Sequence, residues 1–359
     1  MRILDRYVAV RFLAALAFAN LVLLSIYVLA NLVENLDKFL DAHATMDQVF
    51  RYYLNFVPQI IVIMQPIAIL LATLFSMGAL SKNSELMAMR ASGIPLHRTA
   101  MPLLVMGFLL SLVSMGLNET IVPNTNQRRW EINEYEIQKK KQDRRQIMYH
   151  VYRQGENGRI FRLERYDILA NRGFSVMVQK FDKSKLIWTM KAEEMQMVDS
   201  VWHFRRGDIR TFIGADSMRL QTFDSLMRPE WTESPQSFAQ KRKLPENMGY
   251  SELSEWVEFK KRAGTDTTKE MVDLQVKLAF PFACFIMVII AIPIAASPKR
   301  AGFARSFGIA FGIMFFYFTL SRSIYKLGEA GDLPGLVAAW SVNILFLIIG
   351  LVLYAFVRK

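Results

Sequence analysis

The run Leu278–Ala296 reads LAFPFACFIMVIIAIPIAA and contains no Asp, Glu, Lys, Arg or His. An α-helix needs about 20 apolar residues to cross a bilayer core that is about 30 Å thick. We therefore predict that this run spans a membrane. Pro281 and Pro293 lie inside it. Pro293 lies deep enough to kink the helix, and such a kink serves either a moving gate or packing alone.

Five further runs have the same character, and their cores also lack ionisable residues. They are Phe12–Val33, Leu54–Leu80, Met101–Leu117, Phe307–Leu320 and Leu333–Val357. The run that begins at Phe307 is short, and we expect it to extend through Ser321 and Ser323. With 52% apolar residues, 21% charged residues and one cysteine, the chain is neither a disordered protein nor a disulfide-stabilised scaffold.

The first run also has some features of a signal peptide. Arg2 and Arg6 give it a basic start, and Ala17-Phe18-Ala19 imitates a cleavage site. The apolar run nevertheless continues through Tyr27–Ala30, which is too long for a cleaved signal. We therefore expect a retained anchor helix.

Basic residues predict the orientation of the spans. The segments that would share one side carry eleven Lys and Arg and two acids, whereas the opposite short loops carry four bases and six acids. Both termini are therefore expected in the cytoplasm, with the central segment outside. The net charge of +12 is then mostly a topology signal and does not indicate nucleic-acid binding, because no clustered basic patch meets an aromatic stacking platform.

The polar segment between the third and fourth spans is predicted to form an outward-facing antiparallel β-domain. Six strand patterns follow one another, which favours a meander, a sandwich or a jelly roll. They are Ile147–Arg153, Arg159–Tyr166, Phe174–Phe181, Leu186–Val198, Val201–Ile213 and Met218–Leu226. Flanking helices are expected at Thr125–Gln142 and at Glu252–Arg262, the latter with Ser251 as its N-cap. The predicted divisions are residues 1–122, 123–268 and 269–359.

The sequence offers no recognisable catalytic chemistry. It contains no H-E-x-x-H, no Cys/His spacing for a metal, no G-x-S-x-G and no P-loop. Ion-driven transport usually needs ionisable groups inside the membrane, and the spans offer only neutral polar residues. These are Asn20, Asn55, Gln59, Gln65 and Asn343. We therefore expect a chain without metal or cofactor, which is not itself an enzyme and takes any driving energy from elsewhere.

The cytoplasmic loop Ser81–Thr99 is far longer than a turn between two spans requires. Within it, Asn83–Gly93 has the pattern of a short helix, which Asn83 or Ser81 could cap and Gly93 could close in a left-handed conformation. Glu85 and Arg90 complement the helix dipole. Such a helix could transmit motion from a soluble motor, and a loop lying on lipid headgroups is an equal alternative.

A small-x-x-x-small pattern, Gly308-x-x-x-Gly312, occurs in the fifth run. Two glycines at this spacing allow membrane helices to pack closely. Because such pairs are common in membrane helices, the pattern indicates either a specific dimer face or ordinary packing.

Together these features resemble the LptF/LptG family of lipopolysaccharide export permeases over essentially the whole chain. The order of three spans, β-domain and three spans is similar, and Leu4-Asp5-Arg6-Tyr7 resembles the start of the LptG branch. Residues 84–93 are similar to the family's coupling-helix segment. Further similar segments are Lys277–Pro281, Ala291–Pro293, Pro334, Ala338–Trp340, Asn343 and Gly350.

The resemblance implies roles for individual residues. In the family, the coupling helix binds a groove of the cytoplasmic ATPase LptB. The matching positions here are Glu85, Leu86, Met89, Arg90, Ala91 and Gly93. The family's first and fifth spans line the lipid cavity, which makes Tyr27, Asn31, Lys38, Phe315 and Arg322 candidate cavity residues. LptG relatives carry a phosphate-contacting lysine late in the first span; Asn31 occupies that position here, and Lys38 is its candidate substitute.

The resulting prediction is an inner-membrane permease subunit of an ABC-type exporter. It would extract lipopolysaccharide with an LptB-like ATPase dimer and an LptF-like second permease, and pass it to an LptC-like protein and an LptA-like periplasmic bridge. The alternatives are export of another amphiphilic lipid, a non-transporting scaffold for periplasmic partners, or a membrane-embedded enzyme, which would need a polar constellation that the spans lack. Whether the chain acts as LptG, as LptF or in a homodimer stays open.

Overall fold

The computed structural model describes residues 3–138, 147–155, 158–182, 185–199, 201–212, 217–231, 233–235, 238, 245–262, 266–296 and 303–356. The chain divides into two compact units. The helical unit comprises residues 1–138, 244–257 and 267–359, and the β-unit comprises residues 139–243 and 258–266. The segment 123–138, which the sequence placed with the β-domain, belongs to the helical unit.

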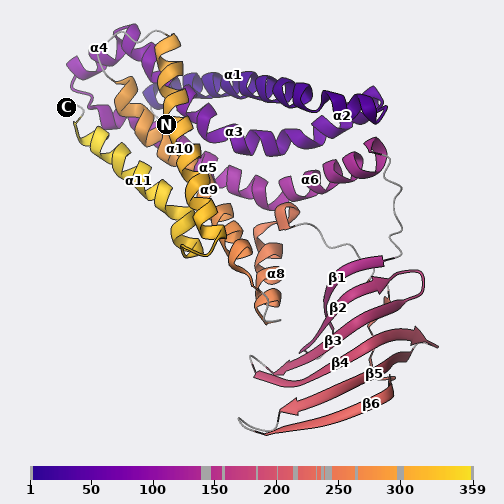
Figure 1. Cartoon of the computed structure of the whole chain (residues 1–359). Coiled ribbons are helices and arrows are strands. Elements are labelled where there is room, and N and C mark those ends of the chain that lie inside the picture. The colour runs from indigo at the N-terminus through magenta and orange to yellow at the C-terminus, as the bar shows by residue number, and fades with distance from the viewer. Residues whose placement is uncertain are drawn as a thin grey trace. The chain divides into compact units, whose positions relative to one another are not determined.

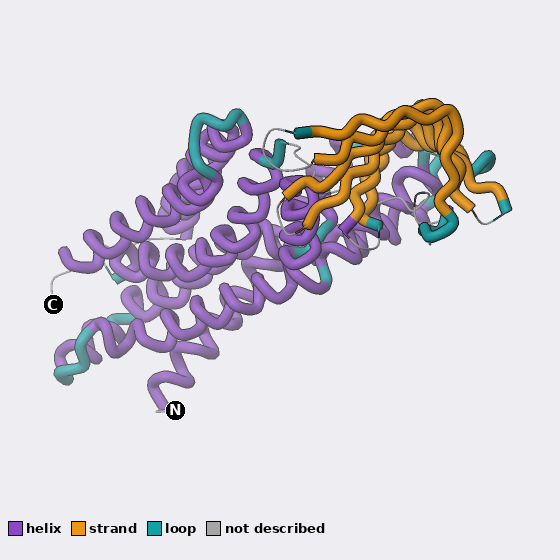
Figure 2. Tube along the Cα trace, turned by 90° about the horizontal axis from the view of Figure 1, so that it is seen from below, coloured by secondary structure: helices purple, strands orange, loops and turns teal. Residues whose placement is uncertain are grey.

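Within the described residues, six helices are long and apolar enough to cross a membrane, which confirms the predicted spans. They are α1 (Ile3–Glu34), α3 (Met46–Lys82), α5 (Leu96–Thr120), α9 (Thr268–Ala295), α10 (Phe303–Glu329) and α11 (Gly335–Phe356). The shorter helices are α2 (Leu36–Asp41), α4 (Glu85–Ala91), α6 (Val122–Glu131) and α8 (Tyr250–Arg262), with a π-helix η1 (Ile132–Ile137) and a 3-10 turn η3 (Pro245–Asn247). Figures 1 and 2 show that both termini lie at one end of this helical unit.

Helices α3 and α9 form the centre of the helical unit. In their most apolar stretches 72% and 67% of the residues are buried, against 17% in α1 and in α10. Glycines allow close approach to α9, and Gly107 and Gly350 are examples: a Cβ at Gly107 of α5 would lie 2.6 Å from Val288, and one at Gly350 of α11 would lie 3.0 Å from Ile289. The outer helices α1 and α10 therefore keep most of their apolar surface uncovered by this chain.

A buried polar contact joins three of the spans. The Tyr317 hydroxyl of α10 donates to Asn343 Oδ1 of α11 at 2.8 Å, and Asn343 Nδ2 donates to the Ala279 carbonyl of α9 at 2.6 Å. Asn343 is 3% exposed. Polar side chains in a membrane bond across helices because hydrocarbon offers them no other partner. This contact therefore fixes the register of α9, α10 and α11.

Both predicted prolines lie inside α9, which runs unbroken from Thr268 to Ala295. Each proline removes one N–H from the helix ladder. Pro281 and Pro293 are buried among the other helices. The surrounding packing therefore holds α9 together across both positions.

Among its described residues, the β-unit contains an antiparallel sheet of six strands in the order β1-β2-β3-β4-β5-β6. The strands are β1 (Ile147–Gln154), β2 (Arg159–Asp167), β3 (Arg172–Asp182), β4 (Lys185–Val198), β5 (Val201–Phe212) and β6 (Met218–Arg228). Each strand pairs with its neighbour in sequence, so the described strands form the meander among the three predicted arrangements (Figure 1). The inserted all-β domain is thereby confirmed, with strand bounds within a few residues of those predicted.

The apolar core of the β-unit is completed by residues that follow β6. Trp231 and Phe238 are 3% and 0% exposed and pack with buried residues of the sheet such as Phe161. Two bonds hold their segment in place: Trp202 Nε1 donates to the Glu233 carbonyl at 2.8 Å, and the Tyr166 hydroxyl donates to the Pro235 carbonyl at 3.2 Å. The sheet's apolar side is therefore occupied by aromatic rings of its own chain.

The two flanking helices differ from the sequence prediction at their starts. Helix α6 begins at Val122, three residues before the predicted Thr125, with Pro123 in its first turn, where a missing N–H costs nothing. Its continuation becomes π-helical at Ile132, and residues 139–142 of the prediction lie outside the described residues. Helix α8 begins at Tyr250, so the prediction that Ser251 is its N-cap is wrong.

The start of α8 is capped from another helix. The Glu119 carboxylate of α5 accepts bonds from the backbone N–H groups of Tyr250 and Ser251, and from the Ser251 hydroxyl at 2.5 Å. A carboxylate at a helix N-terminus is favourable because it meets unpaired N–H groups and the positive end of the dipole. Local sequence could not indicate this cap, since Glu119 and Ser251 are 132 positions apart.

Candidate functional site

The predicted cytoplasmic helix exists as α4, and a two-residue link connects it to the end of α3. Ser84 in this link has a left-handed backbone with φ of 60°. Ser84 is also the N-cap residue, and its side chain makes no capping bond, so the prediction of a cap by Asn83 or Ser81 is wrong. Asn83 Nδ2 instead donates to Glu85 Oε1 at 3.1 Å. The left-handed turn, rather than a capped terminus, sets the direction of α4.

The end of α4 follows the sequence prediction. Gly93 is left-handed with φ of 79°. Its N–H donates to the Arg90 carbonyl at 3.0 Å, and the Ile94 N–H donates to the Met89 carbonyl at 2.9 Å. This pair of bonds is the Schellman motif, which usually needs glycine at the left-handed position. Gly93 therefore closes α4 before Pro95, the N-cap residue of α5.

Helix α4 has an inner and an outer side. Leu86 is 4% exposed and belongs to the membrane core, and Met89 packs partly buried against the same core. Met87 is 65% exposed, and Ala91 is exposed four positions later. Arg90 is half-buried; its Nη2 atom is buried and has no hydrogen-bond partner among the described residues. Met87, Arg90 and Ala91 share one side at i, i+3 and i+4, and we call them the outer face of α4.

The Glu85 carboxylate is bonded to α1. Glu85 Oε2 accepts a bond from the Tyr7 hydroxyl at 2.7 Å, and Oε1 lies 3.2 Å from Arg11 Nη1. Arg11 also places its guanidinium 4.3 Å from the centre of the Tyr7 ring. The hydrogen bond from Tyr7, and then that from Asn83, lowers the pKa of Glu85 below its ordinary value. This carboxylate is therefore a charged anchor to the start of the first span.

A second ion pair holds the same end of α1. Arg98 Nη1 in the first turn of α5 lies 2.8 Å from Asp5 Oδ1, and Arg98 Nη2 donates to Asp5 Oδ2 at 3.0 Å. One hydrogen bond and one ion-pair contact thus join the Arg98 guanidinium to the two oxygens of the Asp5 carboxylate, and a charge-assisted contact of this kind is strong. Asp5 and Tyr7 both belong to the Leu4-Asp5-Arg6-Tyr7 segment, so this motif binds α1 to α4 and α5.

The candidate cavity residues of α1 and α2 lie at the other end of the first span. Asn31 Oδ1 accepts a bond from the Tyr53 hydroxyl of α3 at 3.1 Å, and Tyr27 packs edge-to-face on Phe56 at 5.8 Å. Lys38 Nζ donates to Asn35 Oδ1 at 2.8 Å. Asn31 is thus used to hold α1 against α3, and Lys38 lies on the next short helix, α2.

An aromatic cluster with an arginine lies beside these residues and was missed by the sequence reasoning. Tyr52, Tyr53 and Phe56 of α3 pack on one another and on Phe39 of α2. The Arg129 guanidinium of α6 lies 3.9 Å from the centre of the Phe56 ring. A cation over an aromatic face is held by the ring quadrupole. The spacing Tyr52-Tyr53-x-x-Phe56 could have indicated an aromatic face, but no local pattern pairs it with Arg129.

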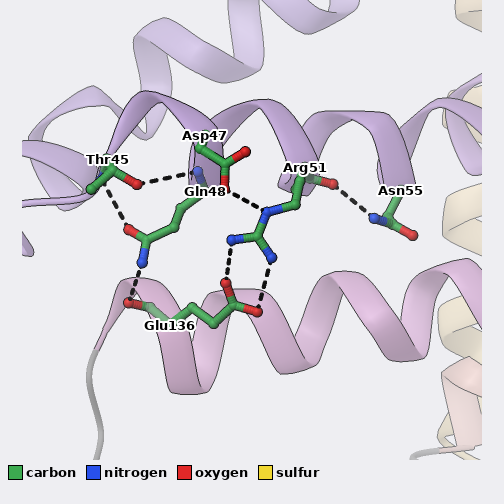
Figure 3. Close-up of polar contacts among 6 residues, drawn as sticks. All are labelled: Thr45, Asp47, Gln48, Arg51, Asn55 and Glu136. Atoms are coloured by element: carbon green, nitrogen blue, oxygen red, sulfur yellow. Dashed lines mark hydrogen bonds and ion pairs between the residues drawn. The ribbon is translucent and has the colours of Figure 1, made fainter.

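Polar contacts fix this end of α3 to η1 (Figure 3). Thr45 and Gln48 form a capping box, and Gln48 Nε2 donates to the Glu136 carbonyl at 3.2 Å. Arg51 makes a two-bond contact with the Glu136 carboxylate, at 2.7 and 3.3 Å, and a 2.8 Å contact with Asp47. The pattern Thr45-x-x-Gln48 is a recognisable helix start. The partner Glu136 could not be read from the sequence, because it is 85 positions from Arg51.

The remaining predicted residues lie on α10. Phe315 is 57% exposed, and the exposed Arg322 places its guanidinium 5.3 Å from the centre of the Tyr325 ring. A Cβ at Gly308 or at Gly312 would meet no atom within 4 Å. Within the described residues, the glycine pair is therefore not used to pack this chain, and the α10 side that carries it is open.

The fold and these sites define a multi-pass membrane protein with a β-domain inserted after its third span and a short helix between its second and third spans. The sequence matches the profile of the family described as "Lipopolysaccharide export system permease LptF/LptG" over residues 6–355. The chain belongs to this family of transporter membrane subunits, and it is a multi-pass inner-membrane protein.

Two curated relatives support the match. The lipopolysaccharide export system permease protein LptG of Escherichia coli strain K12 is 22% identical over 387 residues, which cover 97% of each chain. The protein of the same name from Escherichia coli O6:H1 strain CFT073 gives the same values. The similarity therefore includes both sets of spans and the inserted domain.

Proposed function

We propose that this chain is a permease subunit of an ATP-driven lipopolysaccharide exporter. The observation that carries the proposal is the family match from residue 6 to residue 355, which includes α4 as well as the spans. ATP hydrolysis belongs to a separate cytoplasmic ATPase dimer, and the chain needs no metal or cofactor of its own. Both termini and α4 face the cytoplasm, and the β-unit faces the periplasm, as the basic residues indicate.

The outer face of α4 is the contact for the ATPase. Met87 supplies an exposed apolar group, and Ala91 allows close approach. Arg90 is half-buried and supplies a positive charge whose buried Nη2 atom has no hydrogen-bond partner among the described residues. Leu86 and Met89 face the membrane core and hold α4 from behind. Of the two charged residues that the sequence assigned to this contact, Arg90 is thus better placed than Glu85, whose carboxylate is engaged by α1.

The lipid path lies along the open sides of α1 and α10. Only 17% of the residues in the apolar stretch of each helix are buried by this chain, and Phe315 lies on the open side of α10. A second six-span permease of the same family would face them and enclose a cavity for the acyl chains. Tyr27, Asn31 and Lys38 would line its periplasmic end together with Arg322. Arg129, which lies over Phe56 at that end, joins them as a candidate for phosphate contact.

Extraction in this proposal is mechanical. Exposing acyl chains to water costs about 0.8 kcal/mol per CH₂ group, so pulling several chains into water at once would exceed the energy of an ordinary driving reaction. A closed apolar cavity between two permeases moves the chains from one apolar surface to another. Closure of the ATPase dimer would push α4 and narrow this cavity.

Transfer to the periplasm requires the β-unit. An LptC-like membrane protein would receive the lipid and pass it to an LptA-like bridge through contacts between β-domains. Trp231 and Phe238 fill the apolar side of the sheet. Acyl chains would enter the sheet only when these two rings move out.

The test compares two charge reversals in vesicles that contain this chain, a second permease and the ATPase. Arg90→Glu should reduce ATPase association and ATP-dependent lipid release. Lys82→Glu is the matched control. Lys82 is exposed and does not belong to the outer face, and its substitution changes the charge by the same amount as Arg90→Glu. Equal behaviour of the two variants would contradict the assignment of the outer face. Lipid release that proceeds without ATP would contradict the proposed function itself.

A further inference from the structure

A cavity of about 220 Å³ lies where α5, α8 and α9 meet, and we call it the interfacial cavity. Its walls come from the last turns of α5, from the start of α8, and from Lys277 and Leu278 of α9. All of these residues belong to the helical unit. Met115 and Ser251 at its edge are exposed, so a ligand can enter the cavity from outside.

The interfacial cavity lies at the boundary between apolar and polar sequence. The apolar run of α5 ends immediately before Asn118, and the apolar run of α9 begins immediately after Lys277. Met115 and Leu278 therefore form a wall on the hydrocarbon side, whereas Asn118 and Lys277 lie on the water side. A phospholipid has the same order of parts, with a polar headgroup joined to acyl chains at the membrane surface.

Two half-buried donors that line the cavity are unpaired. Among the residues that the structure describes, the Lys277 ammonium and the Asn118 amide make no hydrogen bond or ion pair. Glu119 and Asp273 attract Lys277 only from beyond ion-pair distance, and Asp273 already accepts a bond from the Tyr325 hydroxyl at 2.5 Å. A partly desolvated charge without a partner is unfavourable, and phosphate oxygens are acceptors for both donors.

Glu119 adds a negative charge to the same cavity. Its carboxylate accepts bonds from the Tyr250 N–H, from the Ser251 N–H at 3.1 Å and from the Ser251 hydroxyl at 2.5 Å. Because a carboxylate has about four acceptor positions, one remains for a ligand. A purely anionic headgroup would pair with Lys277 but be repelled by Glu119. A headgroup with both a phosphate and an ammonium would satisfy the two charges together.

We propose that the interfacial cavity binds the phosphoethanolamine headgroup of a zwitterionic membrane phospholipid. The phosphate accepts bonds from Lys277 and Asn118, the ammonium donates to Glu119, and the acyl chains continue along Met115 and Leu278. The cavity has the volume of about seven water molecules at about 30 Å³ each, which admits one small headgroup but not the carbohydrate headgroup of a lipopolysaccharide. The site is separate from the lipid path along α1 and α10, and it does not depend on the proposed function.

The first experiment compares headgroups on the purified full-length chain in detergent. Short-chain phosphatidylethanolamine, phosphatidylglycerol and phosphatidylcholine are added separately, and native mass spectrometry measures the bound lipid. Phosphatidylethanolamine should bind about ten times more tightly than the other two, because the glycerol headgroup has no ammonium and the choline headgroup has no N–H. Equal or tighter binding of either competitor would overturn the headgroup assignment.

A competition experiment distinguishes a lipid from a soluble phosphate compound. Phosphoethanolamine without acyl chains should displace the bound phosphatidylethanolamine at least about a hundredfold less effectively than the same lipid does, since it lacks the apolar contacts. If the chain-free compound competes as well as the lipid, the cavity is a site for a soluble phosphate compound, and the assignment to a membrane lipid is wrong.

The variant Lys277→Gln should weaken phosphatidylethanolamine binding by about ten- to a hundredfold, through the loss of a charge-assisted contact. Lys269→Gln is the matched control. It removes the same charge from the same helix, at a residue that pairs with Glu329 at 3.4 Å and does not line the cavity. Lys277→Arg should keep most of the affinity. An equal loss in the Lys277→Gln and Lys269→Gln variants would show that the lipid binds elsewhere.

The variant Asn118→Leu tests the site without any change of charge. It should weaken phosphatidylethanolamine binding by about three- to tenfold, and unchanged binding would contradict the role of this donor. Because neither Asn118 nor Lys277 bonds to the rest of the described chain, their replacement removes no internal contact of that kind. The melting temperature without lipid should therefore stay the same, and added phosphatidylethanolamine should raise it less in both variants than in the unmodified chain. An equal rise in all three proteins would overturn the site.

Discussion

At the scale of single residues, the same side-chain type has different uses according to what surrounds it. Glu85, Glu119 and Glu136 all end in carboxylates, but one holds α1, one caps α8 and one receives Arg51. Each contact joins parts of the chain that are at least 74 positions apart. The role of an acid on this protein is therefore decided by its neighbours in space.

The Glu85 anchor should depend on pH in a defined direction. Its bonds lower the pKa of the carboxyl, so the attachment of α4 to α1 is fully present above the ordinary glutamate value of about 4.3. It should be lost as the pH falls through the lower value of the folded chain. The distances between spin labels at Val10→Cys on α1 and Met87→Cys on α4, two exposed positions, should thus be narrowly distributed from neutral pH to about pH 5 and broaden only in stronger acid.

The groups that face Glu85 are Tyr7 and Arg11 on α1 and Asn83 beside it, and the neighbouring Asp5–Arg98 pair also contains an acid. The variant Glu85→Gln shows which of the two acids, Glu85 or Asp5, causes the loss of attachment in acid. In that variant the label distances should be broad already at neutral pH. A remaining acid transition of the same size would assign the effect to Asp5.

The Asn343 contact should contribute measurably to the stability of the bundle. Asn343→Leu leaves the buried Tyr317 hydroxyl without its partner and removes the bond to the Ala279 carbonyl. We expect a loss of about 1–2 kcal/mol in the free energy of unfolding in detergent. Adding Tyr317→Phe should recover part of that loss. Ser323→Ala, which removes an exposed bond within α10 alone, should change stability little.

At the scale of elements, α4 shows how a seven-residue helix is defined by its ends. Such a helix is too short to be stable by itself in water. Its direction is set by the left-handed Ser84, its end by the left-handed Gly93, and its position by Leu86 in the membrane core. The sequence indicated the closing glycine and the helical pattern, while the strained start became visible only in three dimensions.

Gly93 and Gly78 offer a matched pair for testing the closure of α4. A Cβ at either position would meet no atom within 4 Å, so only the backbone conformation differs. Gly93→Ala should destabilise the end of α4 by about 1–2 kcal/mol, because an L-residue is strained in the left-handed region. Gly78→Ala lies inside α3 and should be neutral or stabilising. Hydrogen exchange of the α4 amides measures both; equal protection in the two variants would contradict this account.

At the scale of the whole molecule, burial is unevenly shared among the six spans. Helices α3 and α9 are mostly enclosed, whereas α1 and α10 expose most of their apolar surface. Lipid can cover such surfaces, but α10 also carries the open glycine pair, where a second helix can approach closely. In the chain alone, α3 and α9 therefore form an enclosed centre, whereas one side of α1 and one side of α10 stay uncovered by protein.

Leucine substitutions on two glycines should separate folding from assembly. Gly312→Leu should leave the chain folded, because a Cβ there meets nothing within 4 Å, but should reduce copurification with the second permease. Gly107→Leu should destabilise the chain itself, since a Cβ there would lie 2.6 Å from Val288. Thermal unfolding of the isolated chain measures the effect on folding. The amount of the chain that copurifies with the second permease measures the effect on assembly. Normal assembly of the Gly312 variant would show that this side of α10 faces lipid.

The sequence by itself determined the spans, the inserted sheet and the existence of α4. These features depend on apolar run length, strand alternation and local turn residues, and each can be read within a window of neighbouring positions. The six strands pair in sequence order, so their topology also needed no distant information. The family resemblance added roles for residues such as Glu85 and Asn31.

Only the tertiary structure decided how those residues are used. It placed Glu85 on Tyr7 and Arg11, Asn31 on Tyr53, and Arg129 over Phe56. It also turned Leu86 inward and left the buried Nη2 atom of Arg90 without a hydrogen-bond partner among the described residues. These contacts join segments far apart in the chain, and their energy depends on distances of a few ångströms that no local pattern encodes. Periodicity predicts which elements form, whereas the packing of those elements decides which side chains meet.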